Sequence, residues 1–272
     1  MDGVLNKDET VVLESLADHI LGFDPASISD AALHTAKAGI IDTIGVTLAG
    51  LPEACTQILL DTQGIADGPG PCLILGTNQR TSALDATLVN GTASHALDFD
   101  DFSDVLGGHQ SVPLVPVLFA LGEEHGLSGA DIINAYVVGF EVEHRFAMAV
   151  HPHHYDKGWH PTATLGIFGT VAAAARALKL DREKTSLALA IAASMASGIK
   201  ANFGTMTKPL HVGHSGRAGL MAVLLAERGF EANPSAMEHH QGFFNVFNGA
   251  GNFNPTPLTD AWTGALAIEL PT

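Results

Sequence analysis

The chain has 272 residues, enough for one large domain or two small ones around a substantial buried core. Apolar residues make up 46% and aromatic residues only 6%, a composition that favours closely packed helices over a β-sandwich. The formal net charge of -16, from 13 Lys and Arg against 29 Asp and Glu, excludes nucleic acid and anionic membranes as general partners.

The cysteines and the hydropathy pattern predict a cytoplasmic protein. Cys55 and Cys72 do not form a CxxC pair, which favours two free thiols in a reducing compartment. Residues 1–9 are acidic and polar, unlike a signal peptide. Apolar runs are interrupted by charges or helix breakers before they reach the roughly 18–20 residues of a membrane span. We therefore expect no membrane partner.

The hydrophobic pattern predicts a series of helices joined by short loops. Apolar residues recur at helical spacing, Ser and Asp stand at cap positions, and Gly follows several segments. The predicted helices span residues 10–22, 30–48, 52–63, 82–97, 113–125, 128–150, 161–178, 181–199, 210–228 and 234–238. The helix at 161–178 is rich in Ala and Gly, so we expect burial on most sides. The best strand candidate is 72–75, which follows a cluster of Gly and Pro.

The first of three polar loop segments carries three carboxylates in four residues. Asp98, Asp100 and Asp101 lie between His95 and His109. Carboxylates this close repel one another unless a positive group or a proton is near. The segment is therefore expected to bind a divalent metal, to hold a histidine or lysine, or to act as a base. The alternative is a solvated acidic helix end, which the helix dipole disfavours.

The second segment, residues 157–164, places His160 immediately before a helix that begins with Pro161. The first N–H groups of a helix have no partner within it and can hold carboxylate oxygens. A histidine at such a point is well placed to exchange a proton with a bound acid. The alternative is a loop histidine that packs on Trp159.

The third segment, residues 204–214, combines Thr207 and Lys208 with another predicted helix start. A lysine at a helix start is an anion-binding arrangement. His211 and His214 are three residues apart, so both can lie on one helix face. The alternative is a surface lysine with a capping threonine.

The fourteen histidines raise the alternative of a metal-binding protein. However, the sequence has no HExxH signature, no phosphate-binding GxxxxGK[ST], no GxGxxG after a strand and no GxSxG. We therefore expect neither a catalytic metal nor a nucleotide cofactor nor a serine nucleophile.

Jointly, the three segments resemble the MmgE/PrpD family, which includes 2-methylcitrate dehydratase, cis-aconitate decarboxylase and iminodisuccinate epimerase. The motifs that carry the resemblance are His95-Ala-Leu-Asp-Phe-Asp-Asp, Gly158-Trp-His-Pro-Thr-Ala-Thr-Leu-Gly and Phe203-Gly-Thr-Met-Thr-Lys-Pro-Leu-His. The resemblance implies an all-α, bundle-like domain over residues 1–255. It also implies that 256–272 begins a connection to a second, α/β domain that the chain does not contain.

The resemblance further implies cofactor-independent proton chemistry next to a carboxylate of a small di- or tricarboxylic acid, carried out by a homodimer. The positions that match the family's catalytic residues are Asp98, His109, His160 and Lys208. Lys208 and the helix start after His160 are expected to hold carboxylates, His160 to be the base or acid, and Asp98 to orient His109 or His160. Substrate-binding roles are expected for Thr162, Thr207 and His211.

Two departures from the family pattern bear on the reaction. Phe102 stands where family members commonly have Thr, and Gln110 follows His109 where Pro is usual. These departures favour a 2-methylcitrate dehydratase-like lyase over decarboxylation of cis-aconitate. The alternative function is a catalytically incomplete helical scaffold or subunit that needs a second domain or partner.

Overall fold

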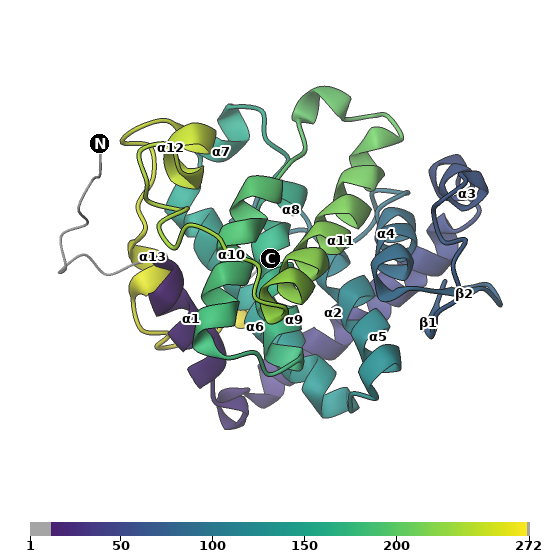
Figure 1. Cartoon of the computed structure of the whole chain (residues 1–272), viewed down its shortest axis with the longest axis horizontal. Coiled ribbons are helices and arrows are strands. Elements are labelled where there is room, and N and C mark those ends of the chain that lie inside the picture. The colour runs from purple at the N-terminus through teal and green to yellow at the C-terminus, as the bar shows by residue number, and fades with distance from the viewer. Residues whose placement is uncertain (1–11, 271–272) are drawn as a thin grey trace.

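The computed structural model describes residues 12–270 and confirms the all-α fold (Figure 1). Two short strands, β1 (Cys72–Leu73) and β2 (Arg80–Thr81), pair antiparallel. The helices, in chain order, are α1 (Val12–Gly22), α2 (Asp30–Gly50), α3 (Ala54–Asp61), α4 (Ala83–Ser94), α5 (Ser111–His125), α6 (Gly129–Val150), α7 (His153–Asp156), α8 (Pro161–Thr164), α9 (Gly166–Ala177), α10 (Arg182–Met195), α11 (Thr207–Glu227), α12 (Phe243–Asn248) and α13 (Thr256–Thr259). Residues 10 and 11 of the first predicted helix lie outside the described residues.

The helix α9 forms the centre of the bundle. It contacts α5, α6, α10 and α11, and its residues are buried except for Arg176, as its Ala- and Gly-rich sequence predicts. Small side chains let these helices approach closely, and aromatic rings fill the remaining space. Phe168 stacks on Phe146 of α6 with ring centroids 4.1 Å apart, and Phe243 meets Phe168 edge-on at 5.0 Å.

Several element boundaries differ from the predicted ones. The predicted helix 161–178 is split at Leu165 into α8 and α9, where Gly166 packs tightly against Pro113 of α5. The helix α10 ends at Met195 rather than at 199, because Ile199 leaves it to pair with Trp159. Residues 234–238 form turns instead of a helix.

The helix α12, by contrast, was not predicted. Its aromatic residues Phe243 and Phe247 pack on each other with centroids 4.4 Å apart. Phe247 also stacks on Trp159 at the same separation. This short helix is therefore stabilised by rings from distant parts of the chain, which local periodicity does not reveal.

The crossing of α4 and α11 positions the two ends of the candidate site. Gly91 of α4 faces Gly213 of α11, and a Cβ atom on Gly213 would lie 2.2 Å from the carbonyl oxygen of Leu88. The two backbones therefore touch with no room for a side chain. Because α11 begins at Thr207 and not at the predicted 210, Lys208 lies in its first turn, beside the end of α4.

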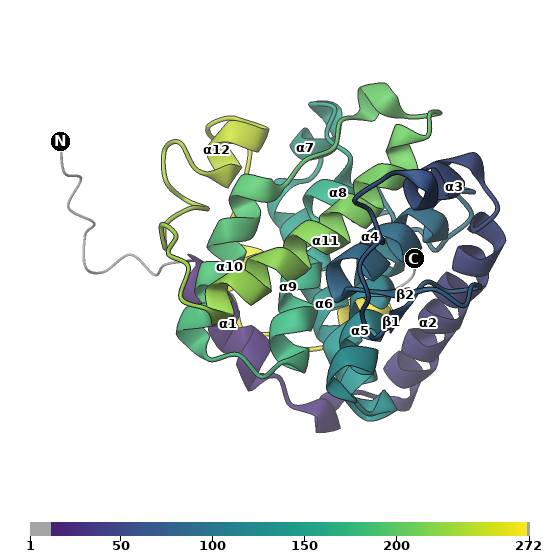
Figure 2. The ribbon, with the colours of Figure 1, turned by 45° about the vertical axis from the view of Figure 1, so that its right-hand side comes forward.

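The helix α2 runs along the outer edge of the bundle (Figure 2). Ile41 and Leu48 on this helix are 68% and 47% exposed. Within residues 12–270, no single helix is long and apolar enough to cross a membrane; α2 and α3 meet that test only as a pair bent by 74°.

A buried glutamate lies behind the site, between α6 and α9. The Glu143 carboxylate is fully buried, and neither oxygen has a hydrogen-bond partner among the described residues. Burial, reinforced by the charge of Asp101, raises the pKa of Glu143 well above its ordinary value. The folded protein therefore binds a proton that the unfolded chain releases, so stability falls as the pH rises from the ordinary glutamate pKa towards the raised one.

We expect Glu143→Gln to raise the free energy of unfolding at pH 8 by about 1.4 kcal/mol for each unit by which burial raises the pKa of Glu143, because the neutral amide does not have to take up a proton on folding. The gain should shrink at pH 4, where the wild-type side chain is protonated in both states. Urea denaturation at both pH values measures the difference. Glu141→Gln is the matched control on the same helix, because Glu141 is paired with Arg145 at 2.8 Å and should lose stability instead. An equal effect of Glu143→Gln at both pH values would contradict the expectation.

Candidate active site

Each of the three clustered carboxylates has closest partners that the other two do not share. Asp98 forms an ion pair with Lys208. Asp100 lies between two imidazole rings, those of His95 and His109. Asp101 accepts the Ser111 N–H at 3.1 Å and thus places a negative charge at the N-terminal end of α5. Because each carboxylate has partners of its own, the repulsion among the three carboxylates is relieved. The segment is therefore not a solvated acidic helix end.

The ion pair of Asp98 and Lys208 joins the end of α4 to the start of α11. Asp98 has a φ of 54°, a left-handed conformation that Asp tolerates better than most residues. This turn leaves the Asp98 side chain 54% exposed while directing it at Lys208, whose side chain is only 12% exposed. The Lys208 ammonium also lies 5.0 Å from the ring centroid of Phe203.

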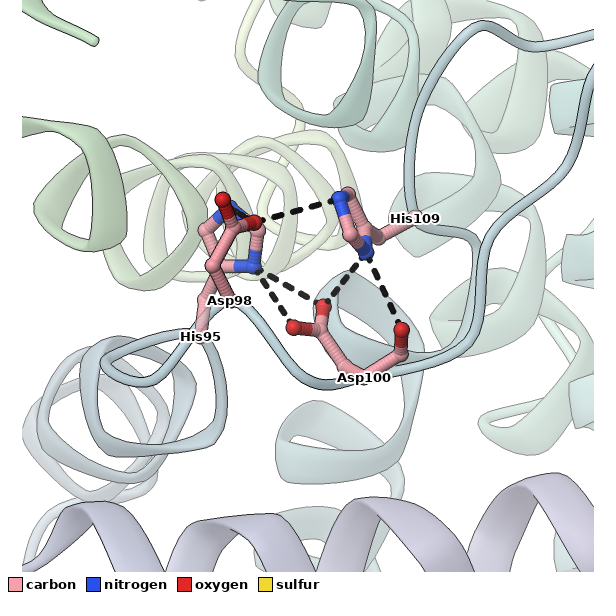
Figure 3. A group of neighbouring side chains, drawn as sticks. All are labelled: His95, Asp98, Asp100 and His109. Carbon is pink, nitrogen blue, oxygen red and sulfur yellow. Dashed lines mark hydrogen bonds and ion pairs between the residues drawn. The ribbon is translucent and has the colours of Figure 1, made fainter. Parts of the chain in front are cut away.

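The Asp100 carboxylate holds both His95 and His109 by their Nδ1 atoms (Figure 3). Its nearer oxygen lies 2.8 Å from Nδ1 of His95, and the distance to Nδ1 of His109 is 3.1 Å. Burial alone would raise the pKa of Asp100, but the hydrogen bonds from His109 and His95 outweigh it and hold the pKa well below its usual range. Asp100 is therefore a buried carboxylate ion that fixes two rings.

His109 reaches the site from a tight loop that packs against α8. Gly108 allows this approach, because a Cβ atom there would lie 2.7 Å from the Thr162 hydroxyl. The same hydroxyl accepts the backbone N–H of His109 at 3.0 Å. Burial lowers the pKa of His109, but its hydrogen bond to Asp100 and the Asp100 charge outweigh burial, so the pKa is raised above its ordinary value.

The Nε2 atom of His109 lies 3.4 Å from Asp98. Asp98 therefore lies beside His109, one of the two histidines that it was expected to orient. Phe102, one of the two departures from the family pattern, packs edge-on against the His109 ring with centroids 5.5 Å apart. An apolar ring thus covers this side of the imidazole.

His160 precedes α8 and is as deeply buried as His95. Its Nδ1 atom is 3.2 Å from Nδ1 of His211 on α11, so one of the two nitrogens donates and the other accepts. Its ring stacks on His95 at 5.7 Å and meets Phe203 edge-on at 4.9 Å. Burial, with the unfavourable charges of His95 and His211, lowers the pKa of His160 to about 2.

The backbone around His160 is fixed by two loops that pair with each other. The His160 N–H donates to the Gly198 carbonyl at 3.0 Å, and the Lys200 N–H donates to Gly158 at 2.7 Å. The helix start after His160 is buried in the structure. Residues 161–164 are completely enclosed, and the N–H groups of Ala163 and Thr164 donate to the His160 carbonyl.

The structure brings most of the predicted site residues together. Asp98, His109 and Lys208 meet at one point, and His160 and His211 form a pair next to it. The other two lie at its margins. Thr162 is completely buried and holds the His109 loop, while Thr207 begins α11 and donates its N–H to the Thr205 hydroxyl.

His95 and Asp100 are parts of the cluster that were not assigned a site role from the sequence. The sequence did contain a pattern that indicates such a role, because three carboxylates so close together require positive or hydrogen-bonding partners. Which of the three would be buried depended on the turn at Asp98, and residue spacing does not show that turn.

A divalent cation is one ligand to test against this cluster. Ligand atoms of His95, Asp98, Asp100 and His109 all lie within 4.8 Å of one another. However, the Lys208 ammonium pairs with Asp98, and both Nδ1 atoms are engaged by Asp100. A cation would have to displace a positive charge and break hydrogen bonds, so the residues present suit a proton-transfer network better than a metal site.

A pocket of about 280 Å³ opens beside the cluster. It lies between the start of α3, the end of α4 and residues 204–209. His95, Asp98 and Lys208 lie in its wall. Because the chain carries a net charge of -16, Lys208 is the local feature that attracts an anionic group here.

Comparison with known proteins identifies the family of the chain. A family model described as the MmgE/PrpD N-terminal domain matches residues 14–256. The chain belongs to the MmgE/PrpD family. Among curated members, it is 32% identical to human cis-aconitate decarboxylase over 91% of this chain and 52% of that protein.

Fungal MmgE/PrpD proteins give similar matches. Cis-aconitate decarboxylase from Aspergillus terreus is 30% identical over 86% of this chain and 49% of its own length. A cis-aconitate decarboxylase-like protein from Aspergillus oryzae is 27% identical over 95% and 56%, respectively. The chain thus spans about half the length of the curated relatives that it matches.

Proposed function

We propose that the chain carries the proton-transfer wall of a lyase active site for a small di- or tricarboxylic acid. The observation that supports it is the cluster in which His95, Asp98 and Lys208 line one pocket, while His109 lies 3.4 Å from Asp98. The relatives named as cis-aconitate decarboxylases act on such an acid, which supports the substrate class. Imidazoles and carboxylates in this arrangement supply proton transfer without an organic cofactor or a metal.

Lys208 is the group that binds a substrate carboxylate in this proposal. Its ammonium is mostly buried and is neutralised by Asp98, which remains half-exposed and is therefore free to move. An incoming carboxylate replaces Asp98 as the partner of Lys208. Asp98 is then left beside Nε2 of His109, where it stabilises the protonated ring.

His109 and His160 supply the acid–base groups. His109, with its raised pKa, is the acid that protonates a leaving group. His160 is neutral because burial lowers its pKa, and it passes protons through its contact with His211. Thr207 and His211, both on α11, are the further substrate-binding residues of this proposal, whereas Thr162 holds the His109 loop in place.

Dehydration in the manner of 2-methylcitrate dehydratase is the reaction that we propose first. Phe102 places an apolar ring against His109, which limits the access of water from that side. The second candidate is decarboxylation of cis-aconitate, which the names of the matched relatives favour.

Assembly and location follow the family resemblance in this proposal. We propose that residues 1–255 form the helical domain and that 256–272 lead towards a second, α/β domain, which supplies the facing wall of the cleft. We further propose a cytoplasmic homodimer. The net charge of -16 opposes binding to nucleic acid or to an anionic membrane.

Deuterium exchange tests the proposed function without knowledge of the net reaction. The full-length protein, with the second domain proposed above, is incubated in D2O with a panel of small di- and tricarboxylic acids, and NMR follows the loss of C–H signals. We expect exchange next to a carboxylate, or formation of an unsaturated product, with at least one acid of the panel. A panel that shows neither, with folded protein, would contradict the proposal.

A further inference from the structure

His95 is buried, yet it faces the pocket. The residue is only 1% exposed, and it lies in the wall of the 280 Å³ pocket together with Asp98 and Lys208. Its Nδ1 atom is bonded to Asp100, but its Nε2 atom has no hydrogen-bond partner within residues 12–270. Oδ1 of Asp98 lies 3.9 Å from Nε2, too far for a hydrogen bond. A buried polar atom without a partner is unusual, and it indicates a place for a ligand atom.

We propose that His95 is a further catalytic residue, which accepts the substrate proton at Nε2, and that Asp100 is the positioning residue that holds the ring's own proton on Nδ1. The inference rests on the proposed function, since it names the base of the same site. It differs from the family-based assignment, in which His160 is the base or acid.

The hydrogen bond to Asp100 decides which nitrogen of His95 is free. A carboxylate ion only accepts hydrogen bonds, so Nδ1 of His95 must carry the proton. In the neutral ring, Nε2 then holds an unshared electron pair. His160 differs because its Nδ1 atom meets a second imidazole, that of His211, which can either donate or accept and so does not fix the place of the proton.

The environments of His95 and His109 push their pKa values in opposite directions. Burial lowers the pKa of His95, and the hydrogen bond to Asp100 only partly offsets this effect. His109 has a raised pKa, because Asp100 outweighs its burial. Such a pair of groups supplies a base and an acid at one pH. The charged and titratable groups around His95 are Asp98, Asp100, His109, His160, Lys208 and His211.

The proton balance of a dehydration fits this pair. Nε2 of His95 takes the proton from the carbon next to the carboxylate, and the electron pair of that C–H bond forms the new double bond. The hydroxyl group leaves with a proton from His109 as water. His95 ends protonated and His109 neutral, and proton exchange with solvent restores both.

Nitrogen NMR of histidine-labelled protein tests the geometry independently of turnover. In the wild-type protein at pH 7, we expect His95 to be neutral, with its proton on Nδ1 and a bare Nε2. In Asp100→Asn the carboxylate that fixes this form is lost, and the form with the proton on Nε2 should gain population. A protonated Nε2 in the wild-type protein, or no change in Asp100→Asn, would overturn the inference whatever the protein's activity.

Deuterium exchange of the substrate tests the role in catalysis. We expect His95→Gln to lower the exchange rate by at least about 10²-fold, the lower contribution of a positioned base. His125→Gln, a change to an exposed histidine at the end of α5, should leave the rate unchanged. Exchange in a folded His95→Gln variant at the wild-type rate would overturn the role of His95 alone. Lack of exchange in the wild-type protein would overturn the proposed function and this role with it.

Discussion

Lys208→Ala is expected to lower kcat/KM for the substrate by roughly 30-fold or more, the factor that corresponds to a loss of about 2 kcal/mol. Its ammonium is the cation in the pocket wall, and its side chain is 12% exposed. Loss of one partner of a largely buried charge pair costs roughly 2–5 kcal/mol. The loss should appear mainly as weaker substrate binding, hence as a higher KM, because the carboxylate is held before and during the reaction. Steady-state kinetics over a range of substrate concentrations measures both parameters.

The control for Lys208→Ala is Lys184→Ala. Lys184 is an exposed lysine near the start of α10, paired loosely with Asp181 at 3.7 Å. It should leave both kinetic parameters unchanged. His160→Ala should lower kcat by a factor of at least about 10², without the rise in KM, because it removes a proton-transfer group and leaves Lys208 in place. Wild-type kinetics in both Lys208→Ala and His160→Ala would refute the assignment of the site.

Much of the candidate site was predictable because its residues are close to one another in local segments. The helix ends near Asp98, His160 and Lys208 mark loops where polar groups and free backbone groups meet. Sequence spacing cannot rank Asp98 against Asp100, since both follow the same helix end. The left-handed turn at Asp98 separates the two: the Asp98 carboxylate points to Lys208, and the Asp100 carboxylate lies between the two imidazoles.

The fold shows a similar division between local and distant causes. Long helices such as α6 follow from apolar spacing and a capping box at Ser128, both of which are local. The end of α10 and the position of α12 depend on Trp159, which pairs with Ile199 and stacks on Phe247. These partners are far from Trp159 in the sequence, so periodicity alone places such boundaries wrongly.

Gly213→Ala is expected to destabilise the protein and to damage the site through the same contact. A Cβ atom on Gly213 would lie 2.2 Å from the Leu88 carbonyl oxygen, so α4 and α11 must move apart. Overpacking of this kind typically costs roughly 1–3 kcal/mol. Asp98 follows α4 and Lys208 begins α11, so the same shift weakens their ion pair.

Gly45→Ala is the matched change on α2, where a Cβ atom meets nothing within 4 Å. It should raise the free energy of unfolding by about 0.5–1 kcal/mol, because alanine favours a helix over glycine. Urea denaturation and deuterium exchange of the substrate separate the two variants. If both alanines stabilise the protein equally, the contact between the two backbones does not limit the position of Lys208. If Gly213→Ala alone lowers both stability and exchange, the close contact between the backbones of α4 and α11 is what holds Lys208 near the histidines.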